Sequence, residues 1–359
     1  MTATLPPQLA RLIRHDVQGM HAYAVQPSTG MVKLVAMENP HRLPPGLQRA
    51  VGDRLASVAL NPYPGERVAT LREALARHAG MPEGFSLMLG NGSDELISLL
   101  AMACDVPGAS ILALMPGFVM YAMSAQLQGL KFIPVDLTPD FELDERAMLA
   151  AIEQHQPSIV YLAYPNNPTA NLWDDAVIER IVQAAPGLVV IDEAYQPFAS
   201  RTYADRITRH EHVLLMRTLS KFGLAGVRIG YMIGRSALVG EIDKVRPPYN
   251  ISVLNCEAAL FALEHADVFD AQAAELRRER GRLLEALGTM PGVKAWRSDA
   301  NMILVRVPDA DRAFQGMKAR GVLVKNVSKM HPLLAQCLRL TVGTADENGQ
   351  MLQALQASL

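Results

Sequence analysis

Short apolar runs and longer amphipathic segments alternate through the middle of the chain. The runs are apolar almost throughout, and they cover 110–115, 158–164, 187–191, 212–216 and 227–233. Between them lie segments with helical spacing, such as 174–185, in which the apolar residues fall on one face. Strands that are buried on both faces and alternate with helices predict a large α/β domain. Its central sheet should be mostly parallel and covered by helices on both faces.

The pattern changes after about residue 245. A long helical stretch is expected over 255–287. Short apolar runs follow it at 302–307, 322–324 and 338–342. Helices followed by a few short strands predict a smaller α+β domain. We therefore expect an N-terminal segment, residues 1–48, that packs with the small domain, then a large domain over 49–245 and a small C-terminal domain over 246–359.

One stretch has to be considered as a membrane span, because residues 106–130 contain no charged side chain. Pro116 and Gly117 lie in its middle and polar side chains follow them, which argues against a continuous apolar helix. We expect instead a buried strand over 110–115, a turn, and a helix from about Val119. The chain is therefore predicted to have no membrane partner.

Composition and charge narrow the class of protein. The chain has 359 residues, 50% of them hydrophobic and 19% charged, with a formal net charge of -2. This composition suits a folded core and lacks the basic excess of a nucleic-acid-binding protein. Cys104, Cys256 and Cys337 are far apart and form no CxxC pair, and the first residues lack the apolar region of a secretory signal. These features predict an unprocessed cytoplasmic protein with reduced thiols.

Polar residues that follow the predicted strands are the candidates for chemistry, because ligands of α/β sheets bind at the carboxyl ends of strands. Gly92 turns directly into an apolar helix, whose first N–H groups could bind a phosphate. The same segment has a structural alternative, since Ser93 or Asp94 could simply cap the helix. His210 and His212 have the spacing of two metal ligands, but no further ligands cluster with them, and we expect no metal site.

Two more groups follow the runs 158–164 and 187–191. The turn over 164–169, with two asparagines between two prolines, could aim the amide of Asn167 at a ligand or could be an ordinary rigid turn. Asp192 ends the next run, where a buried carboxylate is costly unless it meets a cation or a donor. Its partner could be a structural arginine or the protonated nitrogen of a bound cofactor.

Lys221 follows the run 212–216 and is set in a glycine-rich apolar loop, 222–227. Burial lowers the pKa of a lysine and makes its neutral amine nucleophilic, which is what Schiff-base chemistry requires. Enough residues separate Asn167, Asp192 and Lys221 for the chain to leave the sheet and return between them. We therefore predict that these three side chains converge at one edge of the sheet.

This set of motifs resembles that of the fold-type I pyridoxal-phosphate aminotransferases, and most closely the histidinol-phosphate aminotransferases. The resemblance runs from about Tyr23 to Asn348, which is nearly the whole chain. Six motifs occur in the family's order, at 61–64, 92–95, 165–169, 192–195, 218–221 and 338–343. Each motif alone is weak evidence, but six in the same order are specific.

The resemblance implies a role for each matching residue around the cofactor ring. Lys221 would form the Schiff base with pyridoxal phosphate and move the proton between the substrate Cα and the cofactor. Asp192 would pair with the ring nitrogen and keep it protonated. Tyr195 and Asn167 would bond the phenolate oxygen of the ring, and Phe118 would stack on the ring face.

For the phosphate of the cofactor the resemblance implies a set of hydroxyl, guanidinium and backbone N–H groups. These belong to Ser93, Asp94, Ser220 and Arg228. Tyr63 would reach the same phosphate from a second subunit, which implies a homodimer with shared active sites.

On the substrate side the resemblance assigns Arg339 to the α-carboxylate of the amino donor, glutamate, and places Tyr23 nearby. Lys325 would bind the phosphate of histidinol phosphate, where the family more often has arginine. The implied reaction converts imidazole acetol phosphate and glutamate into histidinol phosphate and 2-oxoglutarate, in histidine biosynthesis. Two further departures from the family pattern are Pro62, where an arginine is usual, and Ala170, where a glycine is usual.

The cofactor residues do not fix the substrate. Two other activities on the same scaffold are therefore alternatives, an aromatic amino-acid aminotransferase and a decarboxylase of phosphorylated threonine. A pyridoxal-phosphate-binding transcription regulator would need a DNA-binding domain, for which the residues before Tyr23 leave no room. An inactive dimeric scaffold is disfavoured, because Lys221, Asp192, Tyr195 and Arg228 are all present.

Overall fold

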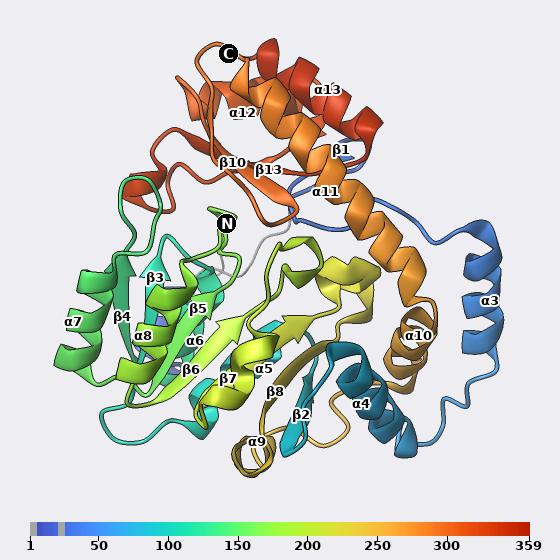
Figure 1. Ribbon diagram of the computed structural model, residues 1–359, viewed down its shortest axis with the longest axis vertical. Helices are drawn as coiled ribbons and strands as arrows, with labels where there is room; N and C mark the ends of the chain where they lie inside the picture. The colour runs from blue at the N-terminus through green and yellow to red at the C-terminus, as the bar shows by residue number, and fades with distance from the viewer. Residues whose placement is uncertain (1–5, 21–25) are drawn as a thin grey trace.

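The structure is a computed structural model that describes residues 6–20 and 26–359, and its largest element is a seven-stranded sheet (Figure 1). The strands lie in the order β2-β8-β7-β6-β5-β3-β4. Their bounds are Phe85–Gly90 (β2), Ser110–Met115 (β3), Lys131–Asp136 (β4), Ile159–Ala163 (β5), Leu188–Asp192 (β6), Val213–Thr218 (β7) and Gly230–Arg235 (β8). Strands β3 to β7 run parallel, and β8 is antiparallel to both of its neighbours. The predicted mostly parallel sheet is therefore confirmed.

Helices cover both faces of this sheet, and the alternation of side chains along the strands explains why. In β5, Val160 and Leu162 belong to one core cluster with helices α4, α7, α8 and α10, while Ile159 and Tyr161 belong to another with α5, α6 and α9. The helix bounds are Glu66–Ala79 (α4), Ser93–Ala103 (α5), Val119–Gln128 (α6), Glu145–His155 (α7), Asp175–Ala184 (α8), Ser236–Asp243 (α9) and Val253–Glu264 (α10). The continuous apolar runs of the sequence are thus strands buried on both sides.

The helical stretch expected over 255–287 is confirmed, and the chain forms two helices there. Helix α10 ends at Glu264, and α11 spans Ala266–Gly288. His265 between them has φ -121° and ψ 35°, which lies outside the helical region. Helix α10 packs against the large sheet, whereas α11 runs away from it toward the C-terminal part of the chain (Figure 1).

A second, four-stranded sheet lies beyond α11 and has the order β12-β13-β10-β9, with all its pairs antiparallel. Its strands and helices are Lys294–Ala295 (β9), Met302–Arg306 (β10), Lys325–Asn326 (β12), Cys337–Thr341 (β13), Ala310–Ala319 (α12) and Ala345–Gln356 (α13). The strand expected over 322–324 does not join this sheet. It is β11, Val322–Leu323, which pairs in parallel with β1, Val32–Lys33. The domain boundaries at 48 and 245 stay a prediction.

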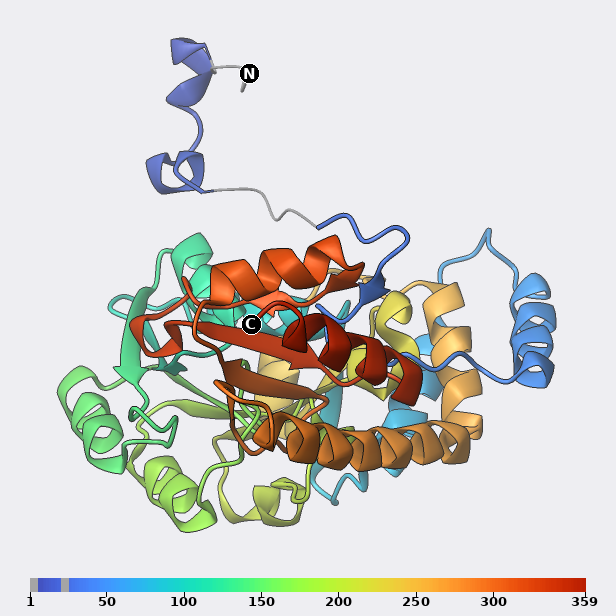
Figure 2. The same cartoon turned by 90° about the horizontal axis from the view of Figure 1, so that it is seen from above.

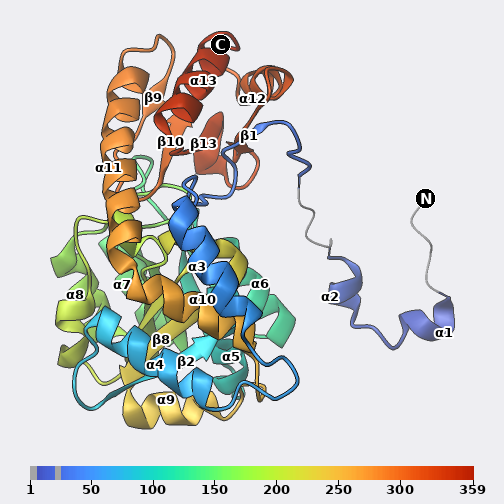
Figure 3. The same cartoon turned by 90° about the vertical axis from the view of Figure 1, so that its right-hand side faces the viewer.

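The first two helices lie outside the main body of the fold. Helices α1, Pro7–Ala10, and α2, His15–Gln18, stand off from it (Figures 2 and 3). Arg14 still donates a 2.9 Å hydrogen bond to the carbonyl of Gln126 in α6. Helix α3, Pro45–Ala56, runs beside α10 (Figure 3).

The short 3-10 and π turns are Gln196–Phe198 (η1), Ala204–Arg209 (η2), Ser220–Leu224 (η3), Ala225–Val227 (η4) and Pro332–Leu334 (η5).

The charge-free stretch 106–130 forms β3, a turn and the start and body of α6, as its proline and glycine predict. Across residues 6–20 and 26–359, no helix is both long and apolar enough to cross a bilayer.

Candidate active site

Asp192 ends strand β6 and is buried, with only 4% of its surface exposed. Its Oδ2 accepts a 2.7 Å hydrogen bond from the hydroxyl of Tyr121, and its Oδ1 accepts a 3.0 Å bond from the backbone N–H of Ala194. Burial raises the pKa of Asp192 to about 6, and these two bonds act in the opposite direction. In the part of the chain that the structure describes, no lysine or arginine forms an ion pair with it, which removes the structural arginine as an explanation.

Tyr195 and Asn167 meet beside Asp192, at the carboxyl ends of β6 and β5. The side-chain N–H of Asn167 donates a 3.0 Å hydrogen bond to the Tyr195 hydroxyl, and both residues are less than a tenth exposed. Burial is also the main cause that raises the pKa of Tyr195, so the phenol stays protonated at neutral pH. Two polar side chains are thus fixed at the edge of the sheet where a ligand is expected.

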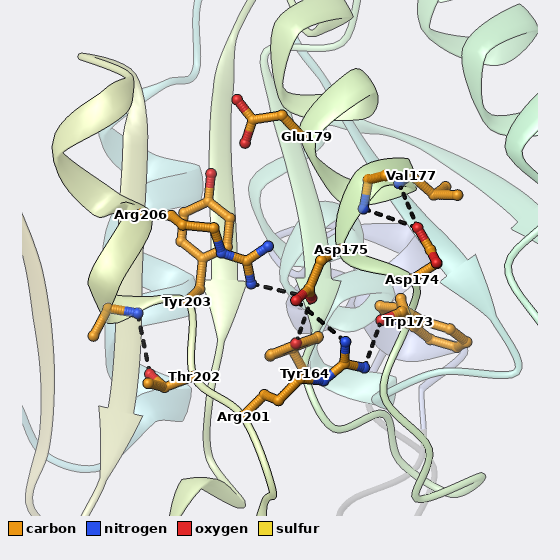
Figure 4. A network of polar contacts seen from close by, with 12 residues as sticks. Tyr164, Trp173, Asp174, Asp175, Val177, Glu179, Arg201, Thr202, Tyr203 and Arg206 are labelled. Carbon is orange, nitrogen blue, oxygen red and sulfur yellow. Dashed lines mark hydrogen bonds and ion pairs between the residues drawn. The ribbon is translucent and has the colours of Figure 1, made fainter.

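A network of polar contacts stabilises the turn that carries Asn167 (Figure 4). The hydroxyl of Tyr164 donates a 2.7 Å hydrogen bond to Asp175 at the start of α8. Arg201 and Arg206 both form ion pairs with the same carboxylate, at 3.2 and 3.1 Å. Because Tyr164 is the first residue of the turn and directly follows β5, this network fixes the point where the chain leaves the strand.

Ala170 follows the same turn and has φ 63°, in the left-handed region that favours glycine. Its side chain is fully buried. The family's usual glycine therefore has a conformational reason, and this chain adopts the same backbone conformation with an alanine.

Lys221 lies in the π turn η3 that follows β7. Its Nζ donates a 2.9 Å hydrogen bond to the carbonyl of Ala36 and lies 5.9 Å from the centre of the Tyr195 ring. Burial, together with the positive charge of Arg339, lowers the pKa of Lys221 to about 8. The structure therefore brings Lys221 next to Tyr195, and its amine is more easily deprotonated than that of an ordinary lysine.

Helix α5 begins at Ser93, and its N-terminus forms the next part of the site. Gly92 precedes it with φ 83°, and neither Ser93 nor Asp94 caps the helix with its side chain, so the structural alternative of a side-chain cap is wrong. The guanidinium of Arg228 packs against Gly92, where a Cβ atom would lie 2.5 Å from Nη2, and it is 3.6 Å from the Asp94 carboxylate. Exposed helix N–H groups beside a guanidinium form a site for an anion.

Ser220 and Phe118 complete the large-sheet side of the site. Ser220 is buried, and its hydroxyl accepts a 3.0 Å hydrogen bond from Thr218. Phe118 directly precedes α6 and contacts Tyr121 edge-on, with ring centres 5.6 Å apart.

Arg339 links the small sheet to this site. It lies in β13, is 8% exposed, and donates a 2.7 Å hydrogen bond to Oδ1 of Asn167 and a 2.8 Å bond to the carbonyl of Val35. Lys325 stands directly opposite Arg339 in the antiparallel pair of β12 and β13, so both side chains lie on the same face of the sheet. Two cationic residues of the predicted substrate side are therefore neighbours.

Tyr63 lies on the surface of the subunit. It is 74% exposed, and its ring stacks on that of Tyr249 with centres 4.2 Å apart. With Pro62 and Arg67 it lines a surface cavity of about 470 Å³, and among the described residues no second predicted site residue lines that cavity. Tyr23 lies outside the described residues.

Sequence reasoning missed two buried contacts of the site. Tyr121 follows Phe118 by three residues, so helical spacing places them on one face, but nothing in the sequence shows that Tyr121 reaches Asp192. Glu193 pairs with Arg217 at 2.8 Å, and both side chains are buried. This pair joins the end of β6 to the end of β7, which precedes Lys221. Its signal was a second acidic residue directly after Asp192.

The histidines considered as metal ligands have other partners. His210 contacts Glu179 at 2.6 Å, and His212 contacts the carbonyl of Val182 at 3.0 Å. Outside the ranges 1–5 and 21–25, no three His, Cys, Asp or Glu side chains gather as a metal site would require.

Comparison with known proteins identifies the family. Residues 29–355 match the family described as aminotransferase class I and II. The chain is 73% identical over 360 residues to the histidinol-phosphate aminotransferase of Polaromonas naphthalenivorans, with 99% of both chains covered. It is 71% identical to that of Methylibium petroleiphilum, which covers 99% of this chain and 96% of the relative.

Solved structures show the same fold. The histidinol-phosphate aminotransferase of Sinorhizobium meliloti, solved in complex with pyridoxal 5'-phosphate, has a TM-score of 0.82 at 24% identity, with 96% of each chain covered. That of Clostridium acetobutylicum has a TM-score of 0.82 at 20% identity and covers 90% of this chain and 98% of its own. The chain therefore belongs to the class I and II aminotransferases and, within them, to the histidinol-phosphate aminotransferases.

Proposed function

We propose that this chain uses pyridoxal phosphate to transfer the amino group of glutamate to imidazole acetol phosphate, which yields histidinol phosphate and 2-oxoglutarate in histidine biosynthesis. The observation that carries the proposal is the 73% identity to a histidinol-phosphate aminotransferase over 99% of both chains. The geometry around Asp192 and Lys221 supports it independently.

Three features of the chain fit pyridoxal phosphate. A buried carboxylate, Asp192, has donors on both oxygens but no ion-pair cation among the described residues, so a protonated ring nitrogen would complete it. A lysine with a lowered pKa, Lys221, suits an aldehyde. The N-terminus of α5, with Arg228 against Gly92, suits a phosphate.

When bound, pyridoxal phosphate supplies an aldehyde that links to amines and a ring that accepts the electron pair left when the substrate Cα loses its proton. Lys221 would provide the amine that holds this aldehyde and would act as the base for the proton at the substrate Cα. Asp192 keeps the ring nitrogen protonated. Tyr195 and Asn167 bond the phenolate oxygen, and Phe118 covers the ring face.

The residues proposed for the phosphate and the substrate act by charge and orientation. Ser93, Asp94, Ser220 and Arg228 hold the cofactor phosphate through backbone N–H, hydroxyl and guanidinium groups. The guanidinium of Arg339 binds the α-carboxylate of glutamate. For the phosphate of the other substrate, Lys325 supplies a point charge, without the paired hydrogen bonds of the arginine that is more usual there. Tyr23 lies outside the described residues and stays a prediction.

The alternative activities have weaker support. A threonine-phosphate decarboxylase of Porphyromonas gingivalis has a similar structure, with a TM-score of 0.77, but at 21% identity this likeness speaks for the fold alone. Five relatives with 67 to 73% identity to this chain are histidinol-phosphate aminotransferases.

A single half-reaction tests the proposal. Purified protein loaded with pyridoxal phosphate is mixed with histidinol phosphate and no keto acid, and the visible absorption band of the cofactor is followed. We expect the band to disappear in the unchanged protein, and to do so about 100-fold more slowly or worse in Asp192→Asn. In Lys221→Ala a visible band should persist, because the base that moves the proton at the substrate Cα is missing. A band that aromatic amino acids remove but histidinol phosphate does not would contradict the proposed substrate.

We also propose that the chain forms a homodimer in which Tyr63 of each subunit reaches the cofactor phosphate of the other. The support is an apolar surface around Tyr63, where Leu60 is 68%, Tyr63 74% and Tyr249 55% exposed. Light scattering after size exclusion should give twice the mass of 39.1 kDa. A monomer that is fully active would contradict it. The cytoplasmic location stays a prediction, supported by three free cysteines.

A further inference from the structure

Tyr121 is a buried tyrosine that the proposed chemistry leaves without a role. It lies in the first turn of α6, is 2% exposed, and its hydroxyl donates a 2.7 Å hydrogen bond to Oδ2 of Asp192. A phenol at this distance from a carboxylate forms a charge-assisted bond, which is stronger than a bond between neutral groups.

The position of the Tyr121 hydroxyl is fixed by its neighbours. Its ring stacks on that of Tyr161 in β5, with centres 4.3 Å apart and planes 10° from parallel. Phe118 contacts it from another side, edge-on at 5.6 Å and 84°. A tyrosine ring held in this way has little freedom, so its hydroxyl is aimed at Asp192 before any ligand binds.

The bond acts on the charge of Asp192. Burial raises the pKa of this carboxyl to about 6, and the nearby negative charges of Asp94 and Glu193 act in the same direction. The hydroxyl of Tyr121 and the backbone N–H of Ala194 oppose them by favouring the ionised form. The pKa of Tyr121 itself is raised well above its usual value, mainly by burial, so the phenol keeps the proton that it donates.

We propose that Tyr121 is a positioning residue for the cofactor, whose hydroxyl holds the carboxylate of Asp192 ionised and oriented toward the ring nitrogen. The inference deepens the proposed function and rests on it. Without this donor, Asp192 becomes a stronger base, and the proton shared with the ring nitrogen shifts from nitrogen to carboxylate oxygen. A ring that is less protonated accepts the electron pair from the substrate Cα less readily.

Two variants separate this role from simple packing. Tyr121→Phe keeps the ring and its stacking and removes only the donor to Asp192. Tyr161→Phe is the matched control, because it removes a buried hydroxyl from the other ring of the same stack. Within residues 6–20 and 26–359, the Tyr161 hydroxyl has no hydrogen-bond partner.

The main measurement is the 15N NMR shift of the ring nitrogen, with each protein loaded with pyridoxal phosphate labelled at that atom. We expect the shift in Tyr121→Phe to move toward that of an unprotonated pyridine, and that in Tyr161→Phe to stay at the value of the unchanged protein. The affinity of Tyr121→Phe for pyridoxal phosphate should fall about tenfold or more. The kcat of the half-reaction should fall, with the KM for histidinol phosphate nearly unchanged.

A second measurement does not depend on removing the hydroxyl. Incorporation of 3-fluorotyrosine at position 121 makes the phenol a stronger donor, and the nitrogen shift should move in the opposite direction. Equal shifts in the unchanged protein and in both of these position-121 proteins would overturn the proposal. So would an equal response of Tyr121→Phe and Tyr161→Phe.

The outcome is separate from that of the proposed function, because the nitrogen shift is read without substrate. If the visible band of the loaded, unchanged protein does not respond to histidinol phosphate, this result counts against the proposed substrate, and the role of Tyr121 can still be tested. If the 15N shift of the ring nitrogen does not change when the Tyr121 donor is altered, this result counts against that role alone.

Discussion

Arg339 donates a 2.7 Å hydrogen bond to Oδ1 of Asn167, although the two residues come from different parts of the fold. Arg339 belongs to β13 of the four-stranded sheet, and Asn167 follows β5 of the seven-stranded sheet. The other end of the same amide donates to Tyr195 at 3.0 Å. The residue proposed for the substrate carboxylate therefore bonds directly to Asn167, which is proposed to contact the cofactor. A carboxylate that binds Arg339 must share or replace this bond.

Replacement of Arg339 by lysine should weaken the binding of glutamate but not that of histidinol phosphate. Arg339→Lys keeps the positive charge and removes the planar pair of N–H donors that grips a carboxylate. We expect the KM for glutamate to rise about tenfold or more. Histidinol phosphate has no carboxylate, so its KM should change little. The measurement is the half-reaction of each substrate with the loaded enzyme, and an equal loss for both would contradict the carboxylate role.

Lys325 should show the opposite preference. It faces Arg339 across the β12 and β13 pair, and its proposed ligand is the phosphate of histidinol phosphate. Lys325→Ala should raise the KM for histidinol phosphate about tenfold and leave glutamate nearly unaffected, because only the first substrate carries a phosphate. Lys325→Arg is the matched variant and should bind histidinol phosphate at least as well as the unchanged protein. If Lys325→Ala weakened glutamate more, the phosphate assignment would be wrong.

The lowered pKa of Lys221 has a consequence for the stability of the cofactor-free protein. Its folded-state pKa is about 8, against a usual value of 10.5, so between these pH values the unfolded chain binds more protons than the folded chain. The free energy of unfolding therefore rises with pH across this window, and below it the charge on Lys221 costs the fold up to about 3 kcal/mol.

Lys221→Met tests this cost, because methionine keeps an unbranched stem and removes the charge. The cofactor-free variant should be more stable than the unchanged protein at pH 7, and the difference should disappear as the pH approaches 10.5. Urea unfolding at several pH values measures it. Lys244→Met is the control, since Lys244 is an exposed lysine, and it should show no such trend. A stability difference for Lys221→Met that is the same at both pH values would contradict the argument.

Local patterns predicted five of the seven strands of the large sheet, because strands that are buried on both faces need apolar residues at every position. Strands β2 and β4 were not predicted, and the run 227–233 begins three residues before β8. The run 110–115 coincides with β3, and the helix expected from Val119 begins there. The break at His265 was not predicted, since helical spacing continues through it and only tertiary packing directs α10 and α11 to different sheets. The order of the strands brings Asn167, Asp192 and Lys221 to one edge, as their spacing predicts.

The individual side-chain contacts of the site could not be predicted as well from the sequence. Ser93 was expected as a possible capping residue, but Gly92 is the N-cap of α5 and no side chain makes a capping hydrogen bond there. The carboxylate of Glu95 instead accepts a hydrogen bond from the N–H of Asn91, before the helix begins. Tyr121 meets Asp192 only because α6 packs on the same face of the sheet as the side chain of Tyr161. Such contacts depend on how helices settle on strands, which residue spacing alone does not specify.

Gly92 gives a test of the proposed phosphate site that separates backbone strain from loss of binding. Gly92 has φ 83°, and a Cβ atom there would lie 2.5 Å from Nη2 of Arg228. Gly80 ends α4 with φ 64°, and a Cβ atom there would meet nothing within 4 Å. Gly80→Ala should therefore lower the free energy of unfolding by about 1 to 2 kcal/mol, because an alanine in the left-handed helical region costs that much. Gly92→Ala should lower it further, because Gly92 has φ 83° and ψ 165°, a backbone region that is essentially restricted to glycine.

Only Gly92→Ala should affect the cofactor, because only there must the guanidinium of Arg228 move away from the N-terminus of α5. We expect about tenfold weaker retention of pyridoxal phosphate in Gly92→Ala and unchanged retention in Gly80→Ala, measured by equilibrium dialysis at one pH and salt concentration. Gly80→Ala also strains the backbone but has no contact with Arg228, so a loss of cofactor seen in both variants would reflect general destabilisation. Retention that is intact in Gly92→Ala, with the protein folded, would mean that the phosphate does not depend on Arg228 in this position.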